Sequence, residues 1–541
     1  MTKNLLDDTI PLHCLIENLR VDSHVTYEIR VWRGVRKMTD SWTVSRRYSD
    51  FDALHAALQL ADVDLHLPPK KVFGNKDRMF VIERQRQLES YLQTVLREPV
   101  LACQLPVKQF LDPDNYSFNF YEEAYRHVSM FFRSEVNWEL VEPLPRIGWR
   151  FRKEYFMIRP KDSPKSSKLI LSYCEPGHPL LLSEKDLSTS LRLLPTIQHP
   201  NIVQTIRTLY NGTGAIIVRP FFDTGSLRDL IYKTKPTALF LKKYGSQKSR
   251  GVNYDDIRRF GRQILEGLKF LIERGMLFGH LHSGNIFMER RVCKLSDLEN
   301  PLLSLPPFYK ANLAEFKKIQ SKEHEAVYAF GLVLYEMGCG CMMRTAAMNV
   351  VPSYCHGEVR ALLESFLTEK SLKSGLPTVD DLISNPLFSP YTPPSEKPQL
   401  KVPSKLKESF RQVCETEEAS MQETARTVDR IKKADKEKSR QASHDKKVEK
   451  FRQQYKEEKA KSRASATTSK QKSKSPADTP PPQRSAPPAP PPPASNPSPP
   501  AAQTQTSSGG SGRGDLLSSI AGFKKGGLKK AETNDRSAPK L

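Results

Sequence analysis

The chain has 541 residues, a formal net charge of +23 and 38% apolar residues, a size and composition typical of about two to four folded units. No run of about 18 apolar residues occurs, which predicts no membrane-spanning helix, and the acidic N-terminus lacks the apolar segment of a secretory signal. The eight cysteines are scattered and form no C-x-x-C pair, which favours a cytosolic protein with reduced thiols over a zinc site or disulfides.

Short alternating apolar runs open the chain, and a helical pattern follows them. Alternation at residues 27–31 and 42–44 predicts strands, and the spacing of apolar residues over 80–96 predicts a helix. Three basic motifs accompany these elements: Arg46-Arg47-Tyr48-Ser49-Asp50-Phe51, then Leu67-Pro68-Pro69-Lys70-Lys71, then Arg84 four residues before Leu88.

In this order the motifs resemble a PX (phox-homology) domain over residues 8–115. The resemblance implies binding of phosphatidylinositol 3-phosphate, and an arginine fork suits a phosphate because it can donate two parallel hydrogen bonds. Lys71 is the alternative to Lys70 if the register shifts by one, and solvated surface charge is the alternative to a lipid site. The implied contacts are Arg47 with the 3-phosphate, Tyr48 with the inositol ring, Lys70 with the 1-phosphate and Arg84 with ring hydroxyls.

Residues 126–395 carry the densest apolar patterning and could bury a large core. A helical pattern over 187–194 precedes His199-Pro200-Asn201-Ile202-Val203, and a buried strand at 215–222 leads into Gly225-Ser226-Leu227. Two further helices are expected at 260–271 and 327–337. These signals resemble a bilobal protein-kinase domain over residues 145–390.

The positions that the resemblance assigns to phosphoryl transfer are largely substituted. A kinase needs a glycine-rich loop, a lysine on the phosphates paired to a glutamate, a catalytic aspartate and metal ligands. Only Gly148 stands in the expected loop, and no carboxylate occurs between Leu187 and Pro200 to pair with a lysine. Ser172 takes the lysine position, His280 the catalytic aspartate position and His282 that of the lysine which follows it.

Two polar residues of the expected active site remain. Asn285 and Asp297 carry oxygen ligands of the kind that Mg²⁺ prefers, although hydrogen bonding within the loop explains them equally well. Lys168 or Lys153 could replace the missing lysine. We therefore predict a pseudokinase that requires no cofactor and leave binding of Mg-ATP open.

The last quarter of the chain is rich in charge and proline. From Lys401 onward there are 30 basic and 16 acidic residues, and the run 404–475 predicts a solvated helix or disorder. The segment 476–506 is a proline-rich linker that could dock proline-binding domains. Nothing indicates base readout, so nucleic acid is excluded as a partner.

Residues 511–532 combine a short amphipathic helix with a Leu-Lys-Lys strand. The pattern resembles a WASP-homology-2 motif and implies binding to monomeric actin, with a generic basic tail as the alternative. The residues implied in actin binding are Leu516, Leu517, Ile520, Leu528, Lys529 and Lys530.

Together the sequence predicts an α+β multidomain chain: a PX domain, a kinase-like domain and a disordered basic and proline-rich tail. The resemblances imply a cytoplasmic adaptor, peripheral on endosomal membranes and at the plasma membrane as a second location, that links membrane cargo such as receptors or ion pumps to actin. The alternative is a weakly active Ser/Thr protein kinase recruited to the same membranes.

Overall fold

The computed structural model describes residues 7–34, 41–70, 77–162, 164, 167–245, 249–276, 278–313, 316, 318–391 and 401–469. The chain divides into two compact units, residues 1–449 and 450–541. The proline-rich linker and the actin-type segment 511–532 lie outside the described residues. In the part of the chain that is described, no helix is long and apolar enough to cross a membrane.

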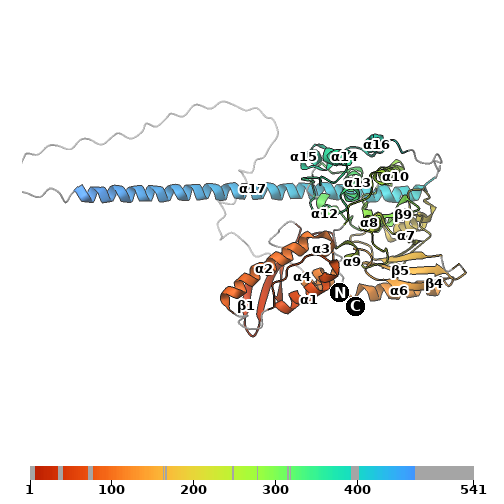
Figure 1. The fold of residues 1–541 in the computed structure, drawn as a ribbon, viewed down its shortest axis with the longest axis horizontal. Coiled ribbons are helices and arrows are strands. Elements are labelled where there is room, and N and C mark those ends of the chain that lie inside the picture. Colours follow the sequence, from red (N-terminus) through yellow and green to blue (C-terminus); the bar gives the residue numbers. More distant parts are fainter. Residues whose placement is uncertain are drawn as a thin grey trace, which may run out of the picture. The chain divides into compact units, whose positions relative to one another are not determined.

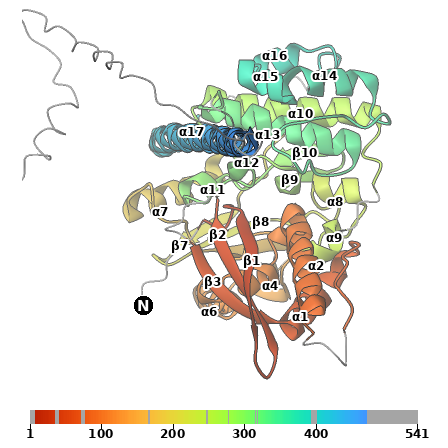
Figure 2. The same cartoon turned by 90° about the vertical axis from the view of Figure 1, so that its left-hand side faces the viewer.

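A three-stranded antiparallel sheet and a set of helices form the first domain (Figures 1 and 2). The strands are β1 (Leu12–Val21), β2 (Val25–Arg33) and β3 (Ser41–Arg47), in that order across the sheet. Alternate residues of β1 face a buried core that α1 and α2 complete, because the side chains of a strand point to opposite faces in turn. The helical segments are α1 (Tyr48–Leu58), η2 (Gln59–Ala61), α2 (Arg78–Arg97), α3 (Pro99–Ala102), α4 (Leu105–Leu111) and α5 (Pro113–Tyr116).

A five-stranded antiparallel sheet opens the second domain. Its order is β4-β5-β6-β8-β7, and α6 (Phe120–Ser134) buries Val128 and Phe131 in one apolar cluster with Phe156 and Ile158 of the sheet. Helix α7 (Glu184–Leu193) and η3 (Leu194–Thr196) connect β6 to β7. The strands are β4 (Trp138–Leu144), β5 (Lys153–Pro160), β6 (Leu169–Cys174), β7 (Arg207–Tyr210) and β8 (Ala215–Pro220).

A mainly helical lobe follows the sheet. Helix α13 (Lys322–Cys339) is buried along nearly its whole length, as its apolar sequence predicts for a helix in the centre of a lobe. The hairpin of β9 (Ile286–Glu289) and β10 (Val292–Leu295) packs against α10 (Tyr254–Glu273). The other helices are α8 (Leu227–Tyr232), α9 (Phe240–Tyr244), η4 (Ser283–Asn285), α11 (Glu299–Leu302), α12 (Lys310–Leu313), α14 (Gly357–Leu367), α15 (Glu369–Ser374) and α16 (Val379–Ser384).

The charged segment after residue 403 forms one long helix, α17 (Ser404–Ser469) (Figure 1). The prediction of a solvated segment is wrong for its first turns, where Leu406, Phe410 and Val413 are buried in the core of the kinase-like lobe. These three residues recur every three or four positions, so they form one apolar face that the surrounding charged residues conceal in a composition average. The core of the second domain therefore extends beyond residue 395.

Polar contacts tie the same turns of α17 to both lobes. Ser409 and Ser190 of α7 share a buried hydrogen bond of 2.8 Å between their hydroxyl oxygens. At the other lobe, Lys322 at the start of α13 places its Nζ 2.6 Å from carboxylate oxygens of both Glu325 and Glu417. The start of α17 thus bridges α7 and α13, and the α+β multidomain architecture predicted from the sequence is confirmed.

Candidate functional site

The two adjacent arginines at the end of β3 have different surroundings. Arg46 donates from Nε to the backbone oxygen of Phe110 at 2.8 Å and from Nη2 to that of Gln109 at 3.2 Å. Arg47 is exposed and forms no ion pair with any described residue. Arg46 is therefore engaged in the fold, whereas the Arg47 guanidinium is available to a ligand.

Tyr48, Arg84 and the proline pair form one cluster next to Arg47. The Tyr48 hydroxyl donates to the backbone oxygen of Pro68 at 2.5 Å, and Arg84 Nη2 donates to that of Pro69 at 2.8 Å. The Arg84 guanidinium lies 4.5 Å from the centre of the Tyr48 ring, within the range of a cation–π contact. These contacts hold the loop that presents the exposed Lys70.

Arg84 retains an unused donor although its side chain is buried. The residue is 6% exposed, and its Nε has no hydrogen-bond partner in the described part of the chain. A buried donor without a partner carries a desolvation cost of about 1–3 kcal/mol, which an incoming acceptor oxygen would offset. The structure thus brings Tyr48 and Arg84 into contact. Arg47 directly precedes Tyr48, and Lys70 directly follows Pro69, to which Arg84 donates. Lys71 lies outside the described residues.

In the kinase-like domain, the loop before β9 uses its polar side chains internally. Asn285 accepts from the backbone N–H of His282 at 3.0 Å and donates to the backbone oxygen of His280 at 2.6 Å. His282 Nδ1 accepts from the N–H of Gly284 at 3.1 Å. Both ends of the Asn285 amide are therefore occupied, which is the loop hydrogen bonding that the sequence left as an alternative to a metal ligand.

His280, at the position where the resemblance predicts a catalytic aspartate, is buried in the same loop. Neither ring nitrogen has a hydrogen-bond partner among the described residues. Burial, together with the nearby positive charges of Arg150 and Lys322, lowers the pKa of His280 well below its usual value. The ring is therefore neutral at pH 7.

Four charged residues meet where the kinase resemblance predicts the phosphates and metal of a nucleotide. Lys153 of β5 places its Nζ 3.1 Å from oxygens of both Asp297 and Glu299. Arg219 of β8 pairs with the same two carboxylates, with Nη1 lying 2.8 Å from Asp297 Oδ1. Two cations and two anions thus neutralise one another in a largely buried site, which suits buried charges because each has partners.

We call Lys153, Arg219, Asp297 and Glu299 the quartet. The pKa values of Lys153 and Asp297 in it follow from burial and from ion pairing. Burial disfavours the ammonium of Lys153, but the carboxylates of Asp297 and Glu299 outweigh this effect and raise the pKa of Lys153. Burial likewise opposes the charged form of Asp297, and Lys153 and Arg219 reverse that effect and lower the pKa of Asp297. Lys153 and Asp297 are therefore both charged at pH 7, and Asp297 already has two cationic partners.

The structure separates the two candidate substitutes for the missing lysine. Lys168 lies at the surface and pairs with Asp223 at 2.9 Å, whereas Lys153 reaches the cleft. Ser172, in the expected lysine position on β6, is buried and its hydroxyl has no hydrogen-bond partner in the described part of the chain. The described residues contain no group of three or more metal-binding side chains.

Sequence reasoning did not identify Arg219 and Glu299 as members of this site. Arg219 directly follows the apolar run Ala215-Ile216-Ile217-Val218. Because a buried charge is costly unless it is paired, an arginine in a buried strand predicts a buried acidic partner. Glu299 stands two positions after Asp297, where the family motif has glycine, so its charge was a second available signal.

Comparison with known proteins gives three separate matches along the chain. A PX domain model matches residues 35–114, a protein tyrosine and serine/threonine kinase model matches residues 179–299, and a WH2 motif model matches residues 509–538. The kinase match begins after β4, β5 and β6, the strands that would carry the glycine-rich loop and the lysine. The match therefore includes the substituted positions His280 and His282 but leaves out the strands before residue 179.

Several whole proteins resemble the chain. It is 45% identical over 430 residues to the PX domain-containing protein kinase-like protein of Mus musculus, an alignment that covers 79% of this chain and 73% of the relative, and equally similar to that of Rattus norvegicus. It is 31% identical over 257 residues to the "Probable inactive serine/threonine-protein kinase slob2" of Dictyostelium discoideum, covering 45% of this chain and 43% of the relative. The chain belongs to the family of PX domain-containing protein kinase-like proteins.

Proposed function

We propose that this protein is an adaptor that binds phosphoinositide membranes through its PX domain and uses a pseudokinase domain as a scaffold. The observation that carries the proposal is the buried quartet around Asp297. In it Lys153 and Arg219 provide the positive charge next to Asp297 that a metal ion would provide in an active kinase. A kinase stabilises the transferred phosphoryl group with a lysine and metal ions, and here the residues that remain pair with one another. The name of the Dictyostelium discoideum relative, "Probable inactive serine/threonine-protein kinase slob2", agrees with this proposal.

The lipid part of the proposal rests on Arg47, Tyr48, Lys70 and Arg84. An exposed arginine and lysine, beside a buried arginine with an unused donor, provide separated cationic contacts for a phosphorylated inositol. The headgroup that we propose is phosphatidylinositol 3-phosphate, which would direct the protein to endosomal membranes. The plasma membrane is the second location that we propose.

Liposome sedimentation of the full-length protein tests the lipid site. We expect binding to vesicles that contain phosphatidylinositol 3-phosphate, and a loss of at least about tenfold for Arg47→Ala, because a charged phosphate contact is worth more than about 1.4 kcal/mol. Arg46→Ala is the matched control, since Arg46 points to the backbone of α4 and its removal should leave the lipid affinity largely unchanged. Equal loss in both variants, or none in Arg47→Ala, would reject the assignment.

The tail supplies the proposed link to actin. The WH2 match over 509–538 includes Leu516, Leu517, Ile520, Leu528, Lys529 and Lys530, and a short amphipathic helix in a groove is a recurring mode of peptide recognition. We propose that this segment binds monomeric actin, that the proline-rich linker docks proline-binding domains and that membrane cargo is held on the scaffold. Leu516→Asp with Leu517→Asp should abolish actin binding in a pull-down; retention of binding would exclude this segment.

A weakly active kinase is the second candidate, and one contact favours it. Lys153 reaches Asp297 from β5, so a lysine is present in the cleft although its strand differs from the expected one. If nucleotide entered, Lys153 could move from the carboxylates to a phosphate while Asp297 held Mg²⁺. A thermal-shift titration of the full-length protein with Mg-ATP, ADP and ATP without metal separates the two candidates.

The proposed pseudokinase predicts no thermal shift with any of these nucleotides. A Mg²⁺-dependent shift that disappears in Asp297→Asn would favour the second candidate, and radiolabelled phosphate transfer would then decide between an enzyme and a nucleotide-gated scaffold. Asp297→Asn keeps the size of the side chain and removes its charge, and the fold of the variant is checked by circular dichroism.

A further inference from the structure

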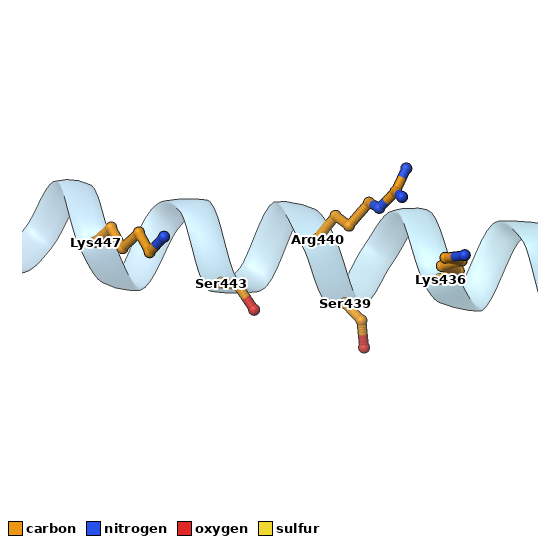
Figure 3. Close-up of a pocket in the computed structure, with 5 residues that line it drawn as sticks. All are labelled: Lys436, Ser439, Arg440, Ser443 and Lys447. Atoms are coloured by element: carbon orange, nitrogen blue, oxygen red, sulfur yellow. The ribbon is translucent and has the colours of Figure 1, made fainter.

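A row of basic residues follows one face of α17 beyond its buried turns. Figure 3 shows Lys436, Ser439, Arg440, Ser443 and Lys447 along the helix. Their offsets from Lys436 are three, four, seven and eleven residues, and residues at these spacings share one side of a helix. We define these five residues as the basic face.

The basic face carries no acidic residue. The three carboxylates between residues 436 and 449 are Glu437, Asp445 and Glu449, and their offsets of one, nine and thirteen residues from Lys436 turn them away from this face. Lys436, Arg440 and Lys447 are all exposed and form no ion pair with a described residue. Their charge is therefore available to an external partner.

The position of the basic face along the helix keeps it clear of the folded lobe. Among the side chains of α17 that the structure describes, Cys414 is the last that is buried, and those from 436 to 447 are all exposed. At a rise of about 1.5 Å per residue, Lys436 lies about 33 Å beyond Cys414, and the basic face itself is about 16 Å long. The described side chains of the basic face are therefore open to solvent and to a partner.

We propose that the basic face is a second membrane contact, which binds anionic lipid headgroups by charge and adds to the affinity of the PX domain. The inference rests on the proposed phosphoinositide binding only for the choice of a membrane as partner. A bilayer surface needs no shape complementarity, and each basic residue near it contributes about a fivefold gain in binding. The small serines between the basic residues let the headgroups approach the helix, and the face contains no aromatic residue on which a nucleic-acid base could stack.

The two contacts act together because they belong to one chain. Once the PX domain holds its lipid, the basic face meets the same surface at high effective concentration, so binding to a membrane with both lipids exceeds the affinity for either lipid alone. A surface contact of this kind weakens as salt screens the charges. Ser439 and Ser443 lie within the basic face, so negative charge at either position opposes it.

The test uses full-length protein and three vesicle compositions: phosphatidylcholine with phosphatidylserine, with phosphatidylinositol 3-phosphate, or with both. We expect the triple variant Lys436→Glu, Arg440→Glu, Lys447→Glu to lose at least tenfold in binding to the phosphatidylserine vesicles. It should bind the phosphatidylinositol 3-phosphate vesicles as the wild type does. Arg47→Ala should give the opposite pattern, so failure of the PX site and failure of the basic face are distinguishable.

The matched control makes the same charge change on the opposite side of the helix, in Lys438→Glu, Arg452→Glu, Lys456→Glu, whose offsets from Lys436 are two, sixteen and twenty residues. It should keep at least half of the binding to phosphatidylserine, and Ser439→Asp with Ser443→Asp should lose several-fold without removing any cation. Equal loss in both triple variants would show a response to net charge alone and overturn the proposal. So would wild-type binding of the first triple variant, or a wild-type protein that does not bind phosphatidylserine at 50 mM salt.

Discussion

Lys153 Nζ lies 3.1 Å from Asp297 Oδ1, so the cation from β5 directly contacts the carboxylate that the sequence predicts as a possible metal ligand. The same Nζ lies 3.1 Å from Glu299, which stands in a position where the kinase motif has glycine. Lys153 of β5 therefore provides the positive charge that β6 lacks, and it also pairs with the additional carboxylate of Glu299. The result is a neutral, buried arrangement that stabilises the fold without a ligand.

Removal of Lys153 should destabilise the protein strongly. Lys153→Ala leaves two buried carboxylates with Arg219 alone, and breaking a buried ion pair costs about 3–5 kcal/mol. Lys168→Ala is the matched control, because its pair with Asp223 is largely exposed and is worth less than about 1 kcal/mol. Thermal and urea unfolding of the two variants give the comparison, and similar losses in both would contradict the role of the quartet.

Much of the fold was predictable from sequence because its elements carry local signals. The helix expected at 80–96 is Arg78–Arg97, and the buried strand expected at 215–222 is Ala215–Pro220. The quartet was not, since Lys153, Arg219 and Glu299 come from three separate segments and meet only in the folded lobe. The start of α17 was missed for another reason: a window average over a long charged helix hides three buried apolar residues.

The buried start of α17 should be essential to the stability of the kinase-like domain. Phe410 is 1% exposed and lies in the main core, so Phe410→Ala should cost about 3–5 kcal/mol in the free energy of unfolding. Phe451→Ala on the same helix is the matched control, because Phe451 is 73% exposed and its truncation should change stability by less than about 0.5 kcal/mol. Urea unfolding of the full-length variants measures both, and a stable Phe410→Ala would refute the packing.

Arg84 should matter to lipid binding through the loop that it holds. Arg84→Ala removes the hydrogen bond to Pro69 and the contact with Tyr48, which frees the segment that presents Lys70. We expect at least tenfold weaker binding to phosphatidylinositol 3-phosphate vesicles, since a charged hydrogen bond contributes about 1.5–3 kcal/mol. Arg86→Ala, on the same helix but exposed beside Glu83, should bind as the wild type does; a loss there equal to that of Arg84→Ala would point to a general charge effect.

His199 should make the stability of the protein depend on pH. Burial, and to a smaller extent the neighbouring Arg274, lowers the pKa of His199 from 6.5 to about 4. Since the unfolded chain then binds the proton more tightly, the stability present above pH 6.5 is lost as the pH falls toward 4. Allowing for the partial exposure of the ring, we expect a loss of about 1 kcal/mol from this residue between pH 7 and pH 5.

His199→Asn isolates this effect. His199 Nδ1 accepts from the N–H of Asn201 at 3.1 Å, and an asparagine oxygen can accept from the N–H two residues on in an Asx turn. The variant keeps that hydrogen bond but cannot titrate, so its unfolding midpoint should fall less than that of the wild type between pH 7 and pH 5. Identical pH profiles for the two proteins would mean that His199 is protonated as readily in the folded protein as in the unfolded chain.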